Sequence, residues 1–361
     1  MKDISLSISP LDASALSAAK ARQDSLAKPP HSLGKLEDIS VKLAGITGQL
    51  YNPVEKRRVL IFASDNGIAH EGVASAPQSV TLSQTINFTR GLTGVAVLAK
   101  HFRAELDVMD VGIDAEFTQP GVRDCKIARG TRNFAVEPAM TREQCLRAIG
   151  IGIEAARRAK REGMQIVGIG EMGIGNTSTS SAVLSVLLDL PAAETVSRGA
   201  GINDEAYKRK VRLIDEAIAR YRPDPADPID VIAKVGGFDI AAMCGAFLGA
   251  ASERLPVVID GFISAVAALC AVRMEPLAAG YMFPSHESRE KGYMLAMDAM
   301  GLKPMLALDM RLGEGSGCPI AFEIISAAES VIAHMATFEE AAINDDYLAE
   351  IRPNKRYQGE A

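Results

Sequence analysis

The sequence predicts an α/β fold with a doubly wound, mainly parallel sheet, helices on both faces, and a smaller helical domain made from the chain ends. Short apolar runs rich in Val, Ile and Leu alternate with longer helical stretches. These runs are continuously apolar, as strands buried on both faces of a parallel sheet are. A length of 361 residues with 48% hydrophobic content also supports a large core.

The expected strands share one feature, an apolar run that ends in a turn with glycine or polar residues. In chain order they are Val59–Ala63, Leu106–Met109, Gln165–Ile169, Pro256–Ile259, Ala278–Phe283 and Met305–Leu308. The helical stretches between and after them are Val80–Phe102, Thr141–Glu162, Ser178–Leu188, Asp204–Arg220, Gly237–Ala251, Ser264–Arg273, Glu290–Met300 and Pro319–Ala333.

The chain ends differ from the middle. Asp12–Ala27 and Ser32–Gln49 are predicted as helices, separated by Lys28-Pro29-Pro30, and a helical tail is expected after Thr337. We therefore expect a small helical domain from residues 1–50 and 337–361, packed on an α/β domain of residues 51–336.

Composition narrows the class of protein. The net charge of −6 gives no reason to expect nucleic-acid binding, and no apolar run reaches the length of a membrane span. The first residues lack the apolar stretch of a signal peptide, and five dispersed cysteines suit free thiols in a reducing compartment. We expect a cytoplasmic protein without a membrane partner. No histidines stand at metal-ligand spacing, so we expect no metal site.

Polar turns after the strands predict one shared site. In such a Rossmann-like sheet, ligands bind at the carboxyl ends of the strands. The candidates in these turns are Glu171, Asp260, Ser285, His286 and Glu314. Ordinary turn chemistry explains any single turn equally well, and His286 is a candidate base or ligand or simply a turn histidine. Their occurrence in one set of turns favours the site.

The glycine-rich stretch Ile166–Ser180 nearly matches two nucleotide motifs. Gly168, Gly170 and Gly173 have the spacing of the dinucleotide fingerprint. That fold needs a second strand soon after the helix, whereas residues 191–202 are polar and contain glycine. The phosphate-binding P-loop needs a lysine, and Asn176 stands in its place.

What remains of the motif is a cradle for a monophosphate. Backbone N–H groups at a helix N-terminus and the hydroxyls of Thr177 and Ser178 would hold the phosphate, with one lysine supplied from elsewhere. The alternative is a close-packed strand–helix turn without a ligand.

A second candidate is the carboxylate at Glu314. It stands between two glycines, just before a helix that carries Pro319 in its first turn. Backed by the apolar Met310 and Leu312, it could have a raised pKa and act as a general base. The alternative is an acidic residue that is there because the helix dipole favours it.

Several long motifs in order give the chain a resemblance over nearly its whole length. They are Lys28–Glu37, Gly170–Thr177, Gly199–Ile202, Gly236–Ala242, Val258–Ser264, Ser285-His286 and Arg311–Gly315. With these motifs the chain resembles the nicotinate-nucleotide–dimethylbenzimidazole phosphoribosyltransferase family, which activates the lower ligand of cobalamin.

The resemblance implies transfer of the 5-phosphoribosyl group from nicotinate mononucleotide to a lower-ligand base, giving an α-riboside phosphate and nicotinate. It implies no cofactor, and a dimer with an identical or a paralogous chain. It makes Glu314 the general base. The residues implied around the ribose phosphate are Glu171, Gly173, Gly175, Asn176 and Lys210, to which the monophosphate interpretation adds Thr177.

Departures from the family pattern gather in the expected acceptor pocket. Ala76 replaces a tyrosine that lines the base pocket in the family, and Ser83 stands where glutamine is expected, with Gln84 one place on. Leu312 completes the expected pocket. Because the phosphate and base motifs are kept, we hypothesise an aromatic acceptor other than dimethylbenzimidazole, such as the phenol or p-cresol that some family members activate.

Two further functions stay open from the residues alone. One is an NAD-dependent oxidoreductase, against which the missing second strand argues. The other is a non-catalytic paralogue that serves as a partner subunit, against which the intact Glu314 argues. The sequence leaves open which acceptor is used and whether the dimer partner is identical.

Overall fold

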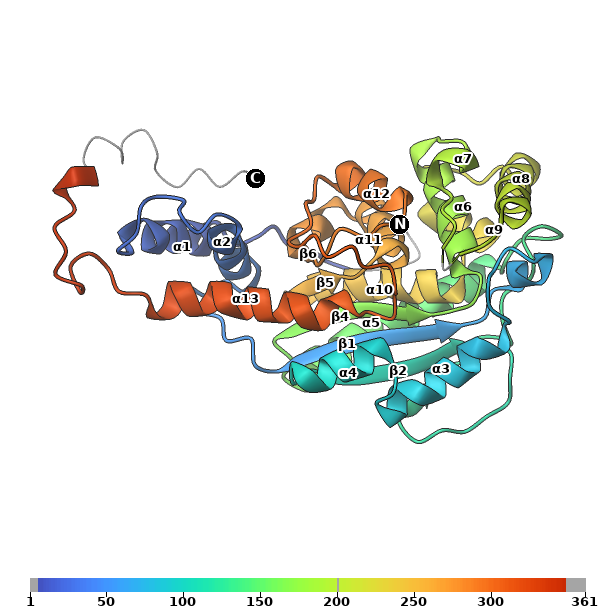
Figure 1. Cartoon of the computed structure of the whole chain (residues 1–361), viewed down its shortest axis with the longest axis horizontal. Helices are drawn as coiled ribbons and strands as arrows, with labels where there is room; N and C mark the ends of the chain where they lie inside the picture. The colour runs from blue at the N-terminus through green and yellow to red at the C-terminus, as the bar shows by residue number, and fades with distance from the viewer. Residues whose placement is uncertain (1–5, 200, 349–361) are drawn as a thin grey trace.

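A six-stranded, fully parallel sheet forms the centre of the computed structural model, which describes residues 6–199 and 201–348 (Figure 1). The strands are β1 (Arg57–Ser64), β2 (Glu105–Gly112), β3 (Val122–Asp124), β4 (Ile166–Met172), β5 (Val257–Ile259) and β6 (Met282–Pro284). Their order is β3-β2-β1-β4-β5-β6, so the sheet is wound in both directions from its middle. The predicted fold class is confirmed.

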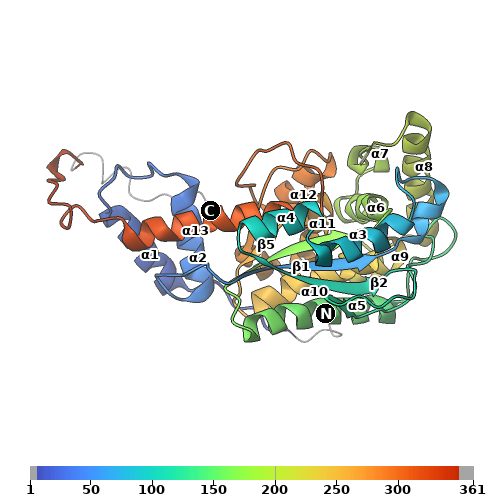
Figure 2. The ribbon, with the colours of Figure 1, turned by 60° about the horizontal axis from the view of Figure 1, so that its bottom comes forward.

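Helices cover both faces of the sheet. Figure 2 shows α5 (Arg142–Arg161) and α10 (Phe238–Ser252) on one face, with α3 (Ser79–Arg90), α4 (Gly94–His101) and α13 (Gly317–His334) on the other. All eight residues of β1 and all seven of β4 are buried, which explains the apolar runs Val59–Ala63 and Ile166–Ile169 within them.

The remaining helices surround this core. They are α1 (Ala13–Ser25), α2 (Lys35–Thr47), α6 (Asn176–Leu188), α7 (Ala192–Thr195), α8 (Asp204–Tyr221), α9 (Pro228–Val235), α11 (Phe262–Met274) and α12 (Gly292–Met300), with 3₁₀ turns at Gly67–Glu71, Pro276–Tyr281 and Asp346–Leu348. Local capping accounts for several starts. Thr141 and Gln144 form a reciprocal capping box at α5, and Asn203 caps α8.

Some predicted elements were wrong. The single helix expected over Val80–Phe102 is two helices, because Gly91 takes a left-handed φ of 72° and Thr93 starts a new helix as its N-cap. Met305–Leu308 is not a strand and forms one isolated bridge, from Leu306 to His286. Most of Ala278–Phe283 is a 3₁₀ turn. The prediction missed β3, α7 and α9.

The helical unit at the N-terminus packs on α13, which runs from the sheet to this unit (Figure 1). Arg22 of α1 donates hydrogen bonds to the carbonyls of Ile332 and Met335, joining the two. The helical tail expected after Thr337 is not a helix in its described part, which has turns and one 3₁₀ turn, and residues 349–361 lie outside the described residues. The division into two domains stays a prediction.

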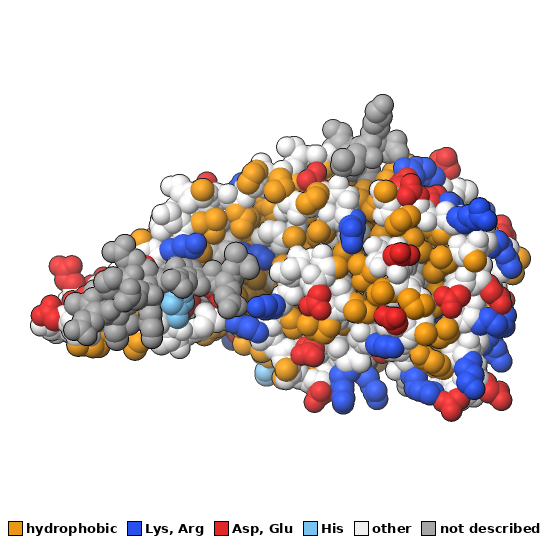
Figure 3. Space-filling view, turned by 90° about the horizontal axis from the view of Figure 1, so that it is seen from above, with side chains coloured by type: hydrophobic (Ala, Val, Ile, Leu, Met, Phe, Trp, Pro, Cys, Tyr) orange, Lys and Arg blue, Asp and Glu red, His pale blue; other side chains and the backbone are white. Residues whose placement is uncertain are grey.

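The surface shows no gathering of one charge on the face in Figure 3, where acidic and basic side chains are interspersed among apolar ones. Within the described residues, no helix combines the length and the apolar character that a membrane span requires. All five cysteines are free thiols.

Candidate active site

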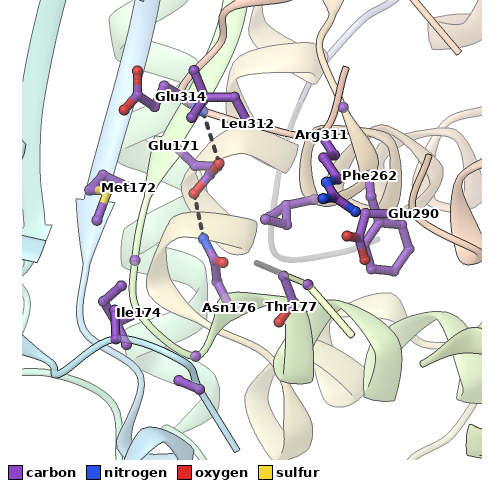
Figure 4. Close-up of a pocket in the computed structure, with 18 of the residues that line it drawn as sticks. Glu171, Met172, Ile174, Asn176, Thr177, Phe262, Glu290, Arg311, Leu312 and Glu314 are labelled. Atoms are coloured by element: carbon purple, nitrogen blue, oxygen red, sulfur yellow. Dashed lines mark hydrogen bonds between the residues drawn. The ribbon is translucent and has the colours of Figure 1, made fainter. Parts of the chain in front are cut away.

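A cavity of about 260 Å³ lies at the carboxyl ends of the central strands (Figure 4). It is lined by residues from the turns that the sequence singled out and from the segment before α3. Those among the predicted site residues are Ala76, Gln84, Glu171, Gly173, Gly175, Asn176, Thr177, Lys210, Asp260, His286, Leu312 and Glu314. The structure thus brings together residues that are up to 238 positions apart, between 76 and 314.

The glycines of the apparent fingerprint serve close packing. A methyl group at Gly168 would lie 2.4 Å from Cys318 Cβ, and one at Gly170 would lie 2.5 Å from the carbonyl oxygen of Glu314. They let α13 and the loop before it lie directly on β4. The spacing that resembles a dinucleotide motif therefore has a packing cause.

The N-terminus of α6 faces the cavity. The loop after β4 turns at Gly175, whose φ of 94° is left-handed, and α6 begins at Asn176 without a side-chain cap. The first N–H groups of the helix therefore have no capping side chain and carry the positive end of its dipole. This arrangement can accept an anion.

Lys210 reaches this helix end from α8. Its Nζ donates to Thr177 Oγ1 at 2.8 Å, and the side chain is almost fully buried. Burial lowers the pKa of Lys210 to about 8, while the negative charge of Glu290 opposes this. A lysine thus stands beside the helix N-terminus although it is 33 residues away in sequence.

Glu314 lies in a loop of left-handed residues and not at the end of a strand. Its φ is 65°, between Gly313 at 82° and Gly315 at 88°. Its Oε1 accepts from Gln84 Nε2 at 3.0 Å, and its Oε2 accepts from the backbone N–H of Val95 at 3.1 Å, in the first turn of α4. Burial raises the pKa of Glu314, and these donors partly oppose the rise.

Glu171, at the end of β4, is a buried carboxylate that lies between the start of α6 and the loop that carries Glu314. Its Oε2 accepts from Asn176 Nδ2 and its Oε1 accepts from the backbone N–H of Glu314 at 3.2 Å. Burial raises the pKa of Glu171 to about 8, helped by the charge of Asp239 and opposed by the Asn176 bond.

Asp260, which follows β5, holds the loop of Glu314 by accepting hydrogen bonds from two of its backbone N–H groups. Its Oδ1 accepts from the N–H of Gly317 at 2.7 Å and its Oδ2 from that of Gly315 at 3.0 Å. Burial raises the pKa of Asp260 to about 7, opposed by these backbone donors. Ser285 and His286 pack beside it, with 3.0 Å between Ser285 Oγ and His286 Nδ1. Burial lowers the pKa of His286. Ser285 is fully buried and does not line the cavity.

Three of the four expected acceptor-pocket residues line the cavity, and the fourth does not. Ala76, Gln84 and Leu312 line the cavity, and Leu312 lies against the start of α4, since a methyl group at Gly94 would be 2.4 Å from it. Ser83 does not line the cavity: it is exposed on α3 and donates to a carbonyl one turn earlier. The helical rotation between neighbours turns Gln84 inward and Ser83 outward.

Several lining residues were missed by sequence reasoning. Arg198, Phe262, Glu290 and Arg311 lie around the cavity, and Asp239 lies beneath it. Phe262, Arg311 and Asp239 stand inside motifs that carried the resemblance, so position in a motif was their signal. Among the described residues, no three His, Cys, Asp or Glu side chains are arranged to hold a metal ion.

Comparison with known proteins identifies the chain first as a phosphoribosyltransferase, because that family's model matches residues 8–343. A nicotinate-nucleotide–dimethylbenzimidazole phosphoribosyltransferase from Clostridium perfringens is 52% identical over 357 residues, 99% of either chain. One of the same name from Acetivibrio thermocellus is 51% identical over 322 residues, 89% of this chain and 92% of its own. The crystal structure of CobT from Thermus thermophilus matches with a TM-score of 0.89 and 39% identity, over 92% of this chain and 99% of that one.

The chain therefore belongs to the nicotinate-nucleotide–dimethylbenzimidazole phosphoribosyltransferase family, as its motifs predicted. It is an enzyme of the phosphoribosyltransferase class. These matches give no support to an NAD-dependent oxidoreductase or to a non-catalytic partner subunit.

Proposed function

We propose that the protein transfers the 5-phosphoribosyl group of nicotinate mononucleotide to an aromatic lower-ligand base in cobalamin biosynthesis. The products are an α-riboside phosphate and nicotinate. The names of relatives about 50% identical over most of the chain support this pair of substrates. The observation that carries the proposal is the placement of a buried carboxylate, Glu314, across one cavity from an uncapped helix N-terminus with a buried lysine.

The phosphate of the nucleotide binds at the start of α6. The backbone N–H of Thr177 in the first turn of α6, the Thr177 hydroxyl and the Lys210 ammonium are the donors for a monophosphate. A triphosphate would need the P-loop lysine, and Asn176 stands there instead.

Glu314 acts as the general base. A benzimidazole acceptor attacks C1′ of the ribose with its unprotonated ring nitrogen, from the face opposite nicotinate, while the proton on its other ring nitrogen passes to the Glu314 carboxylate. The bond from C1′ to the pyridinium nitrogen breaks, and its electron pair neutralises the ring, so nicotinate leaves without a proton. Attack from the opposite face inverts the β anomer to α. The Glu314 carboxylate accepts from Gln84 Nε2 and from the backbone N–H groups of Val95 and Gly94, and its two oxygens keep a lone pair for the proton.

Glu171 supports the ribosyl group during transfer. Positive charge develops at C1′ as the pyridinium leaves; a positive charge nearby favours ionisation of Glu171, and the ionised carboxylate stabilises that charge. Glu171 lines the cavity between the start of α6 and Glu314, where the ribose has to lie if its phosphate binds at α6.

The identity of the aromatic acceptor is the second part of the proposal. Ala76 leaves room where the family pattern has a tyrosine, and Gln84 and Leu312 complete that wall. A phenol or p-cresol carries an O–H that Glu314 can deprotonate in the same way, so a phenolic acceptor is the second candidate beside a benzimidazole. A dimer with an identical or paralogous chain, and a cytoplasmic location, complete the proposal.

One experiment tests both the transfer reaction and the choice of acceptor. The purified protein receives nicotinate mononucleotide with dimethylbenzimidazole, purines, phenol or p-cresol in turn, and nicotinate release is measured. Turnover with any aromatic acceptor supports the transfer reaction, and no turnover with all of them refutes it. Efficient use of dimethylbenzimidazole without turnover of phenols would rule out the phenolic acceptor.

A further inference from the structure

Asp239 is a buried acid to which the transfer reaction assigns no task. It lies in the first turn of α10, has 0% exposure and does not line the cavity. Within the described residues it forms no ion pair with a lysine or arginine. A buried carboxylate without a cationic partner is costly, so its contacts need a reason.

A chain of hydrogen bonds joins Asp239 to the loop of the general base. Asn176 Nδ2 donates to Asp239 Oδ2 at 3.2 Å and also to Glu171 Oε2. Glu171 Oε1 then accepts from the backbone N–H of Glu314 at 3.2 Å. Figure 4 shows the two links nearest the cavity as dashed lines, from Asn176 to Glu171 and from Glu171 to Glu314.

The chain of hydrogen bonds determines which way the Asn176 amide points. An ionised Asp239 can only accept, so the amide has to present its NH₂ group and not its oxygen, and the same NH₂ group donates to Glu171 Oε2. With Asp239 in place, the two hydrogens of that NH₂ group have one acceptor each. Without it, the amide loses the acceptor that opposes rotation away from Glu171.

The backbone closes tightly around Asp239. A methyl group at Gly237 would lie 2.2 Å from Asp239 Oδ1, and one at Gly173 would lie 3.0 Å from Oδ2. The N–H of Ile240 donates to Oδ1 at 3.0 Å. Glycine at both positions lets the chain approach this closely, so the carboxylate is held in one place.

The charges that act on Glu171 come from other acids. Glu171 lies on β4, Asp239 lies on α10, and Asp260 at the end of β5 adds its negative charge. Burial and the charge of Asp239 raise the pKa of Glu171 to about 8, and burial raises the pKa of Asp239 to about 6 against the bond from Asn176. Removal of the Asp239 charge therefore lowers the pKa of Glu171.

We propose that Asp239 is a positioning residue for the transfer reaction. It orients the Asn176 amide, and this amide holds the Glu171 carboxylate against the backbone of Glu314. Asp239 thus sets the place of the base while touching neither substrate. The inference rests on the proposed function in taking Glu171 and Glu314 as parts of the reacting site.

A double-mutant cycle tests the proposal. D239N, E171Q and the double variant are compared with the wild type for kcat and KM of nicotinate release from about pH 5 to about pH 9. D239N should lower kcat about tenfold with KM for nicotinate mononucleotide within about twofold. Its acid limb should move to lower pH, because the like charge beside Glu171 is gone. In the E171Q background, D239N should cause no further loss and no shift of the limb.

Asp107→Asn is the matched control. Asp107 is also buried, but it pairs with Arg123 and Arg158 at β2, away from the cavity. D107N should lower the melting temperature and leave the pH profile unchanged. If D239N does not fold, D239S enters the same cycle, since its hydroxyl can accept from the neighbouring N–H of Ile240 but is too short to replace the acceptor of the Asn176 amide.

An unchanged kcat or acid limb in the Asp239 variant, or a loss that multiplies with that of E171Q, overturns the proposal. The wild type separates this failure from failure of the proposed function. If wild-type protein releases nicotinate and Asp239 proves silent, the inference alone is wrong. If the wild type releases none, the proposed function is refuted and the role of Asp239 with it.

Discussion

Replacing Glu314 with glutamine should abolish most turnover while the nucleotide still binds. Glutamine keeps the shape of the side chain and one carbonyl oxygen, which can still accept from the backbone N–H of Val95, 3.1 Å away in the wild type. The contact with Gln84 becomes amide to amide, and rotation of the Gln84 amide would restore a donor–acceptor pair there at the cost of its bond from Asn87 Nδ2. We therefore expect a loss of about 1 kcal/mol in folding stability, the size of one hydrogen bond.

The effect on chemistry should be much larger. A general base contributes a factor of roughly 10²–10⁴ in rate, which is about 3–5 kcal/mol of activation free energy. Burial raises the pKa of Glu314, so the wild-type rate should rise with pH as the carboxylate ionises. The residual rate of E314Q should lack the contribution of Glu314 to this limb and keep the contribution of Glu171.

Stopped-time measurement of nicotinate release and calorimetric binding of nicotinate mononucleotide separate the two effects. The exposed Glu116, changed to Gln, is the matched control and should behave as the wild type. Turnover of E314Q within about threefold of the wild type, or the same pH profile, would refute the role of Glu314 as base.

Three further predictions follow from the site. Lys210→Met should raise KM for nicotinate mononucleotide at least about tenfold, because a charge-assisted bond to the phosphate is lost, whereas the exposed Lys208→Met should not; equal KM values would remove Lys210 from the phosphate site. Ala76→Tyr should raise KM for the acceptor about tenfold and leave that of the nucleotide unchanged, with Ser83→Tyr, outside the cavity, as control; a change in the nucleotide KM alone would contradict the assignment of this wall to the acceptor. Burial raises the pKa of Glu171 from 4.5 to about 8, so between about pH 5 and about pH 8 the folded protein keeps a proton that the unfolded chain releases, and the stability contributed by this group falls as pH rises. E171Q should therefore show a shallower fall of melting temperature over that range, and equal slopes would disprove the raised pKa.

Much of the sheet could be predicted because burial on both faces leaves a local mark. The first four predicted strands and most helices lie where the structure has them. Errors arose where a short local signal competed with tertiary packing. Met305–Leu308 is apolar enough for a strand, yet it only bridges to His286, since the sheet already ends at β6. The helix predicted over Val80–Phe102 ends at Gly91, and the apolar pattern did not indicate that this glycine takes a left-handed φ.

The motifs predicted which residues belong to the site better than they predicted how those residues are arranged. The resemblance to the family assigned Glu314, Glu171 and Lys210 to one site, and the structure has all three lining one cavity although they lie on different elements. The sequence did not indicate that the glycines of the fingerprint serve packing, nor that Gln84 and not Ser83 turns inward. Both depend on which face of an element meets a neighbour, and neighbours are set by the fold.

The sequence by itself determined the fold class, the enzyme family and the residue types available for chemistry, because periodicity, glycine spacing and motif order are properties of the chain alone. The tertiary structure decided how those residues are partnered. It set Glu314 at the start of α4, Lys210 beside Thr177, and Asp239 beneath Asn176. Burial, and with it the raised pKa of each acid and the lowered pKa of the lysine, comes from these long-range contacts, which no local pattern in the sequence records.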